Sequence, residues 1–144
     1  MSNKKIKNAK KSKITLEKKE PEYISCSFRY LTTNKKYLIS GHSKLKQNNK
    51  EKIKCYEELF YKIKEMQSMP WSEFMLRPKS IGQETINYSQ LNIRPNNLNI
   101  TKDSKVHSIR FCNQNYRIIG YIDEKVPILH IIGFDLDYSA YDHG

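Results

Sequence analysis

Two arginines and several proton-carrying side chains stand out in the C-terminal third of the chain. Arg110 and Arg117 lie on either side of a turn-like stretch, CNQN, in a region of regular apolar alternation. Guanidinium groups bind phosphate in bidentate geometry, so two arginines held together could form an anion site. Opposed arginines on a sheet repel unless an anion or an acid lies between them. The alternatives are that a Glu or Asp from a helix layer pairs with them, or that both extend into water.

Four side chains could transfer protons beside these arginines: His130, Asp135, Tyr141 and His143. RNA cleavage through the 2′-hydroxyl needs a base near that oxygen, an acid at the leaving oxygen and cations on the phosphate. Histidine suits proton transfer because its ordinary pKa is about 6.5. His130, within an apolar strand, could equally be a core histidine, and His143 lies next to the C-terminus.

Other chemistries find less support in the sequence. Asp135, Asp137, Asp142 and His143 could in principle bind a metal, but a solvated acidic tail is favoured. The three cysteines are scattered singly without C-x-x-C spacing, which argues against a disulfide framework and a zinc site. The sequence contains no Gly-rich phosphate loop, G-x-S-x-G, H-E-x-x-H or dinucleotide fingerprint. We therefore predict neither a metal nor a small-molecule cofactor.

Three β-rich runs must position the candidate residues. They span Val106–Cys112, Tyr116–Ile122 and Val126–Phe134, are separated by CNQN and DEK, and predict an antiparallel meander. The alternation places the two arginines and His130 on one face. The other face is apolar and contains Ile109, Phe111, Ile118, Leu129 and Ile131.

Turn lengths fix which residues lie opposite each other. A two-residue loop at Asn113-Gln114, or a four-residue loop from Cys112 to Asn115, places Arg110 directly across from Arg117. A loop at Asp123-Glu124 would place His130 across from Arg117, whereas a three-residue loop would shift that pairing by one.

Apolar spacing in the rest of the domain predicts helices, which we expect to pack on the apolar face of the sheet. Helical spacing of apolar residues from 48 to 69, ended by Pro70, predicts a helix, and Trp71–Met75 could begin a short second one. Residues 23–31 alternate as a half-buried strand, with Tyr37–Gly41 as the returning strand of a hairpin. The segment 77–106 predicts loop with short strand or helix pieces. We thus expect one α+β domain over residues 21–144, an antiparallel sheet with helices packed on one face.

The first 20 residues differ in composition from the rest. They contain eight Lys and two Glu, and so contribute +6 of the net charge of +11. Their sparse apolar residues predict a disordered basic arm. The positive charge favours a polyanionic partner such as RNA, including ribosomal RNA. The compositional bias of an AT-rich genome would also produce many Lys, Asn, Ile and Tyr.

Membrane insertion and secretion are not expected. No apolar run approaches the roughly 18 residues of a spanning helix. The positive N-terminus is not followed by the apolar segment of a signal peptide. A cytoplasmic protein without a membrane partner is the default expectation.

The segment 108–141, SIRFCNQNYRIIGYIDEKVPILHIIGF and the residues after it, resembles the sheet of RelE-type toxins of bacterial toxin–antitoxin modules. The similarity consists of a basic strand, Tyr116-Arg117 and the turn Asp123-Glu124-Lys125-Val126. The resemblance implies helices on one sheet face and an open basic face that cuts mRNA in the ribosomal A site. Arg110 and Arg117 would match family basic residues, and Tyr141 or His143 the C-terminal Tyr or His.

These observations give one functional hypothesis and two alternatives. The first is a RelE-like endoribonuclease that acts without metal, with RNA or the ribosome as its partner and an acidic antitoxin as its inhibitor. The catalytic candidates are Arg110, Arg117, His130, Tyr141 and His143. The alternatives are a non-catalytic nucleic-acid- or ribosome-binding protein, and a protein-interaction module of a phage or mobile element.

Overall fold

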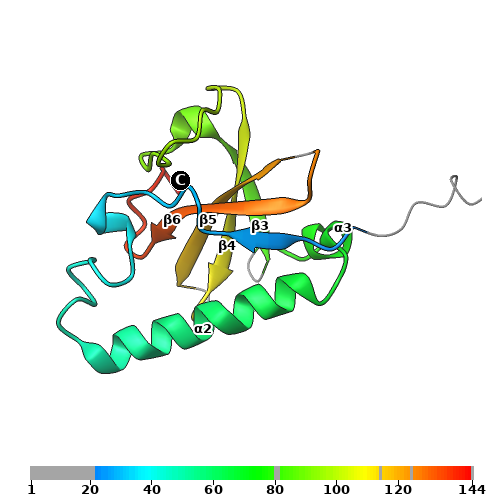
Figure 1. Cartoon of the computed structure of the whole chain (residues 1–144). Helices are drawn as coiled ribbons and strands as arrows, with labels where there is room; N and C mark the ends of the chain where they lie inside the picture. The colour runs from blue at the N-terminus through cyan, green and yellow to red at the C-terminus, as the bar shows by residue number, and fades with distance from the viewer. Residues whose placement is uncertain (1–21, 80–81, 114, 124, 144) are drawn as a thin grey trace, which may run out of the picture.

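A five-stranded sheet lies at the centre of this computed structural model, which describes residues 22–79, 82–113, 115–123 and 125–143. The strand order is β2-β6-β5-β4-β3 (Figure 1). The strands are β2 (Ser25–Ser27), β3 (Gln83–Asn87), β4 (Lys105–Phe111), β5 (Tyr116–Asp123) and β6 (Ile128–Asp135). Strands β3 to β6 form an antiparallel meander, and β2 pairs in parallel with β6. The predicted α+β class is confirmed, and the predicted arm over residues 1–20 lies outside the described residues.

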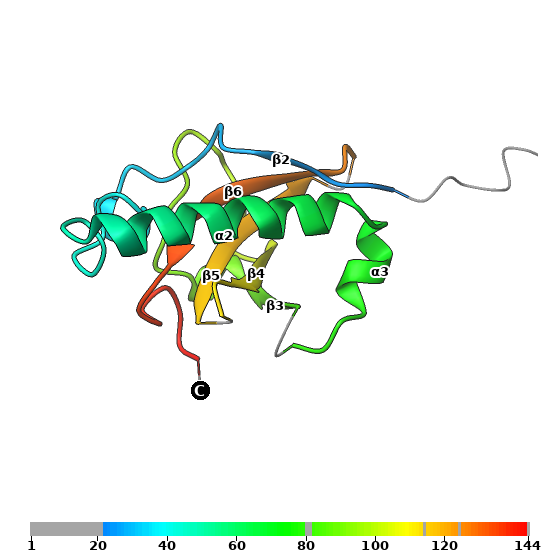
Figure 2. The same ribbon diagram turned by 90° about the horizontal axis from the view of Figure 1, so that it is seen from below.

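The long helix α2 spans Asn49–Gln67, as the apolar spacing predicted. The side chain of Asn48 accepts a hydrogen bond from the backbone N–H of Glu51 at 3.1 Å, and so caps a donor that the first turn leaves without a partner. The helix ends before Pro70, which cannot continue it. A second helix, α3 (Trp71–Met75), follows directly. Figure 2 shows α2 lying across one face of the sheet.

The main hydrophobic core lies between these helices and the sheet. From α2 it receives Cys55, Leu59 and Met66, and from α3 it receives Phe74. The sheet contributes the predicted apolar set Ile109, Phe111, Ile118, Leu129 and Ile131, each at most 1% exposed. Burial of each large apolar side chain stabilises the fold by roughly 1.5–3 kcal/mol. The predicted packing of the helix on this face is confirmed.

A second core covers the opposite sheet face, so the expectation of an open basic face is wrong. Ile86, Val106, Ile119 and Ile132 point to this side from the sheet. The residues that cover them come from segments outside α2 and α3 and include Tyr37, Leu91, Ile93, Ala140 and Tyr141. The segment 77–106 was predicted as loop with short strand or helix pieces, and its described residues contain β3 and the 3-10 turn η2 (Tyr88–Gln90). Between η2 and β4, Leu91 and Ile93 are buried in the second core, and Ile100 is partly buried against it.

The predicted N-terminal hairpin does not form. Only β2 is a strand, and its partner is β6, with Cys26 opposite Leu129. In place of the turn and the returning strand, the chain forms the 3-10 turn η1 (Lys35–Tyr37), capped by the side chain of Asn34. Tyr37 and Ile39 do not lie in a strand. Tyr37 is buried in the core on one face of the sheet, and Ile39 is buried in the core on the other. The apolar alternation indicated a strand, but it carried no information about which partner the strand would find.

None of the helices in the described part of the chain is both long and apolar enough to cross a bilayer.

Candidate functional site

The predicted pairing of the two arginines is confirmed, because Arg110 lies directly across from Arg117 on β4 and β5. The two side chains have different environments. Arg117 is only 4% exposed, donates from Nη1 to the carbonyl of Asn115 at 3.2 Å, and has its guanidinium 5.1 Å from the ring centre of Tyr138. Arg110 is half-buried and donates from Nε to the carbonyl of Lys79 at 2.8 Å. Arg110 is thus the more accessible cation of the pair.

An acid from the sheet itself lies on the other side of Arg117. Asp135, at the end of β6, is the cross-strand partner of Arg117 and is 1% exposed. A buried carboxylate in this position offsets the repulsion between the opposed arginines. The alternative of an acidic partner for the arginines is therefore favoured, although the acid comes from β6 and not from the helix layer.

His143 extends this group through Asp135. Its Nε2 lies 2.9 Å from Oδ2 of Asp135, and its ring stacks on Tyr141 with centroids 3.9 Å apart. Because a carboxylate accepts the Nε2 proton, Nδ1 of the neutral ring keeps a lone pair. The side chain of His143 is 21% exposed, so this imidazole is oriented by a buried acid while it remains in contact with solvent.

Tyr141 anchors the tail to the sheet. Its hydroxyl donates to Oγ of Ser108 at 2.8 Å, and the residue is 4% exposed. Burial raises the pKa of the phenol, so it stays protonated at neutral pH. Ser108 stands where the resemblance would require a second basic residue, and here it binds the tail instead.

His130 does not belong to this group, so its predicted place beside Arg117 is wrong. It lies opposite Tyr121, and the centroid of its ring is 5.0 Å from that of Tyr30. Five residues along β6 separate it from Asp135, or roughly 16 Å at strand spacing. The turn before β6 has four residues instead of two, because Asp123 pairs with Ile128, and a β-bulge shifts the register further. Burial lowers the pKa of His130, in keeping with the core-histidine alternative.

We call Arg110, Arg117, Asp135, Tyr141 and His143 the C-terminal cluster. The sequence named all five as candidates but missed Tyr138. The ring of Tyr138 contacts the guanidinium of Arg117 and the imidazole of His143. It also missed that Asp135 orients His143. The backbone N–H of Ser139 donates to Oδ1 of both Asp135 and Asp137, a local turn pattern that could have signalled the folded-back tail.

The contacts of Tyr138, Tyr141 and Asp135 join the buried Arg117 to the oriented imidazole of His143. Arg110 adds a second cation beside this network, as the cross-strand neighbour of Arg117. Among the described residues, no group of three or more His, Cys, Asp or Glu side chains is placed to hold a metal ion. Asp137, the other acid of the tail, pairs with the buried His42 at 3.3 Å and so stabilises the tail.

Comparisons with protein-family models, with curated proteins and with solved structures find no match for this chain. The resemblance to RelE-type toxins therefore stays a prediction, and the functional argument depends on the residues of the cluster.

Proposed function

We propose that this protein is a RelE-like endoribonuclease that cleaves RNA through its 2′-hydroxyl at the C-terminal cluster, without a metal ion. The observation that carries the proposal is the 2.9 Å contact between His143 and Asp135, next to two opposed arginines. A carboxylate-oriented imidazole beside guanidinium groups combines proton transfer with stabilisation of charge on phosphate. The α+β arrangement, with helices on one sheet face, is the one that the resemblance implies.

Accessibility divides the cluster into two roles. His143 and Arg110 are the members with exposed surface, so they are the proposed catalytic residues. Nδ1 of His143 would take the proton of the 2′-hydroxyl, and Arg110 would bind the phosphate that gains charge. Arg117 and Tyr141 are buried, so Arg117 is proposed to add positive potential and Tyr141 to hold the His143 ring in position. The 2′-oxygen then bonds to phosphorus, the bond between phosphorus and the 5′-oxygen breaks, and the 5′-oxygen takes a proton from solvent water at the exposed site. The products are a 2′,3′-cyclic phosphate and a 5′-hydroxyl end.

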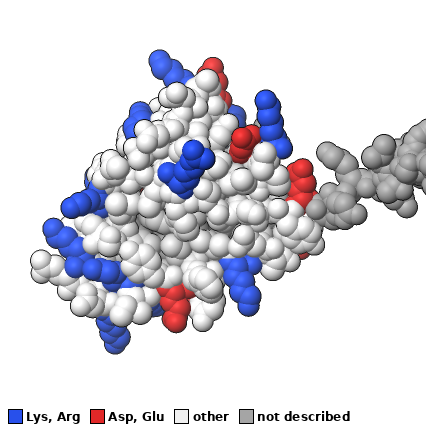
Figure 3. All heavy atoms as spheres, in the orientation of Figure 1, with Lys and Arg blue, Asp and Glu red and all other residues white. Residues whose placement is uncertain are grey.

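The face of the molecule in Figure 3 carries scattered cations. Its Lys and Arg side chains lie from the edges to near the middle, and a few Asp and Glu side chains lie among them. A single broad basic surface is not seen on that face. The proposed contacts with phosphate therefore come from Arg110 and from the Lys-rich residues 1–20. An acidic antitoxin protein would compete for the same charges.

The test is cleavage of single-stranded RNA, and of mRNA on ribosomes, in the presence of a metal chelator. His143→Gln should lower the cleavage rate by roughly 10²-fold or more if it removes the proton acceptor. The matched control is His130→Gln, the same substitution outside the cluster, which should leave the rate near that of the wild type. Equal rates for the wild type and His143→Gln, with both folded, would refute the proposed site.

The burial of Arg117 and Tyr141 also favours a second candidate, a non-catalytic RNA- or ribosome-binding protein. In that case the network would serve only to fix the tail on the sheet. RNA binding that weakens with salt, with no cyclic phosphate product on either RNA substrate, would select this alternative.

A further inference from the structure

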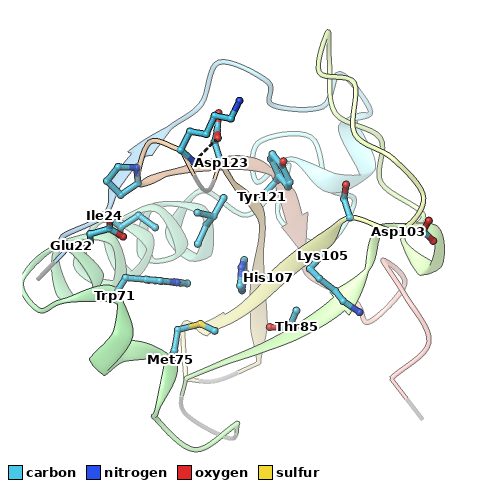
Figure 4. A pocket seen from close by; sticks show the side chains of 14 residues that line it. Glu22, Ile24, Trp71, Met75, Thr85, Asp103, Lys105, His107, Tyr121 and Asp123 are labelled. Carbon is cyan, nitrogen blue, oxygen red and sulfur yellow. Dashed lines mark hydrogen bonds between the residues drawn. The ribbon is translucent and has the colours of Figure 1, made fainter. Parts of the chain in front are cut away.

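A cavity of about 760 Å³ lies at the opposite end of the sheet from the C-terminal cluster, beside α3. Its volume falls within the range of about 300–1,000 Å³ that is typical of small-molecule sites. Figure 4 shows Trp71 and Met75 of α3 on one side, Tyr121 of β5 on another, and His107 of β4 between them. Ile24 and Ile122 add apolar surface, and Thr85 and Ser104 add hydroxyl groups. The cavity is therefore amphipathic: Trp71, which also packs against the main core, is its aromatic wall, and Tyr121 lines its rim and also packs against the second core.

Trp71 forms a fixed aromatic wall. Its ring stacks on Phe74, with centroids 5.4 Å apart and planes inclined by 20°, and Phe74 is fully buried. The His107 ring lies perpendicular to the Trp71 ring in a T-shaped pair, with centroids 5.4 Å apart. A ring held by two neighbours loses little conformational entropy when a planar ligand stacks on it.

His107 supplies a hydrogen-bond acceptor of defined position. Its Nδ1 lies 2.9 Å from Oε1 of Gln83, which can only accept, so Nδ1 carries the proton. The ring is buried and its pKa is lowered to about 4, so Nε2 keeps its lone pair at neutral pH. Nε2 makes no hydrogen bond to any described residue, although His107 lines the cavity.

The charges around the cavity disfavour a phosphate inside it. Three acids, Glu22, Asp103 and Asp123, line it together with two lysines. One of the lysines, Lys105, already donates to the side-chain oxygen of Asn87 at 2.6 Å. A ligand without formal charge, with a flat ring and N–H donors, fits this balance better than an anion does.

We propose that this cavity binds an unpaired nucleobase, stacked on Trp71 and donating an N–H to Nε2 of His107. Nucleobases combine a π-face with ring or exocyclic N–H donors, which are the two features that the walls and the acceptor recognise. The base comes either from a single RNA strand or from a free nucleoside. This inference does not depend on cleavage at the C-terminal cluster, because binding of a base alone defines it.

Trp71 is the only tryptophan in the chain, so its fluorescence reports on the cavity directly. The full-length protein is titrated with adenosine, guanosine, cytidine and uridine, with ribose as the control ligand, and separately with short single-stranded RNA. Saturable quenching by at least one nucleoside, and none by ribose, is the expected result. Competition between that nucleoside and the RNA would identify the strand as a source of the base. Nucleoside binding without competition would identify free nucleoside. No saturable quenching by any nucleoside would overturn the proposal.

Two variants locate the binding. Tyr121→Leu removes the aromatic ring at the rim and keeps an apolar side chain, and it should weaken nucleoside binding by about tenfold or more. The matched control is Tyr61→Leu on the outer surface of α2, where Tyr61 is 55% exposed, and it should bind as the wild type does. His107→Asn can still donate to Gln83 but lacks the Nε2 acceptor, and about a tenfold loss is expected. Unchanged affinity in both Tyr121→Leu and His107→Asn would place the binding elsewhere and overturn the assignment, whatever the outcome of the cleavage assay.

Discussion

Mild acid should destabilise the fold, and the largest contribution from a histidine should come from His107. This imidazole is 8% exposed, donates from Nδ1 to Gln83 and forms a T-shaped pair with Trp71. Burial lowers its pKa from the ordinary value of 6.5 to about 4. Protonation in the native state would place a charge in an apolar setting where the acceptor Oε1 of Gln83 serves only one of the two nitrogens.

The sign and the size follow from the two pKa values. As the pH falls from 7, the unfolded chain takes up a proton on His107 near pH 6.5, whereas the folded chain does so only near pH 4. The unfolded state thus binds more protons in this window, so the free energy of unfolding falls as the pH drops. The separation corresponds to about 3 kcal/mol, a large part of the roughly 5–15 kcal/mol that stabilises a typical domain. His130, whose pKa is also lowered by burial, acts in the same direction.

The assay is urea unfolding of the wild type and of His107→Phe at a series of pH values between 4 and 7. Phenylalanine keeps a ring against Trp71 but cannot take up a proton, and it loses the bond to Gln83 at every pH alike. Protonation of carboxylates and of His130 contributes to both proteins, so the difference between the two profiles isolates His107. The wild type should lose about 3 kcal/mol more than the variant between pH 7 and pH 4. Parallel profiles would refute the reasoning that burial holds His107 neutral.

Three further predictions concern stability and charge. Ile118→Asp should abolish the cooperative thermal transition, because it places a carboxylate in the fully buried core beneath α2; a melting temperature near that of the wild type would contradict this packing. In urea unfolding, Arg117→Ala should lower the free energy of unfolding by about 3 kcal/mol, because it leaves the buried Asp135 without its cross-strand cation, whereas Arg110→Ala should lower it by less than about 1 kcal/mol. Equal losses would show that burial does not distinguish the two arginines. Deletion of residues 1–20 should leave the melting temperature unchanged. It should make the slope of log RNA affinity against log salt concentration shallower, because eight lysines are removed, and an unaltered slope would exclude phosphate contacts from these residues.

The parts of the fold that depend on local pattern were predictable. Apolar spacing gave α2 and the face that it covers, and the CNQN turn gave the pairing of Arg110 with Arg117, because a tight turn fixes the register of both strands. His130 was misplaced because the preceding turn has two more residues than predicted and because the β-bulge at Ile119/Gly120 was not predicted, although an isolated glycine within a strand is a signal for a bulge.

Long-range contacts could not be predicted from the same patterns. The alternation in residues 23–31 suits a strand in a local hairpin as well as one that pairs with β6 about a hundred residues away. The tail posed the same difficulty, since Asp135 and His143 meet only after the chain folds back over Ser139. The individual residue types of the cluster were predictable, but the network that divides them into buried and exposed members was not.

The parallel pairing of β2 with β6 has a consequence for biosynthesis. β6 is the last of the five described strands to be made, yet it lies between β2 and β5 in the sheet. Until β6 leaves the ribosome, β2 has no partner and the apolar side of α2 has only part of its cover. The nascent chain therefore exposes apolar surface throughout the roughly hundred residues between β2 and β6, and chaperones that bind such surface have a long window in which to act. A message cut short before the codons of β6 would yield a product unable to complete its sheet, and cellular proteases would remove it.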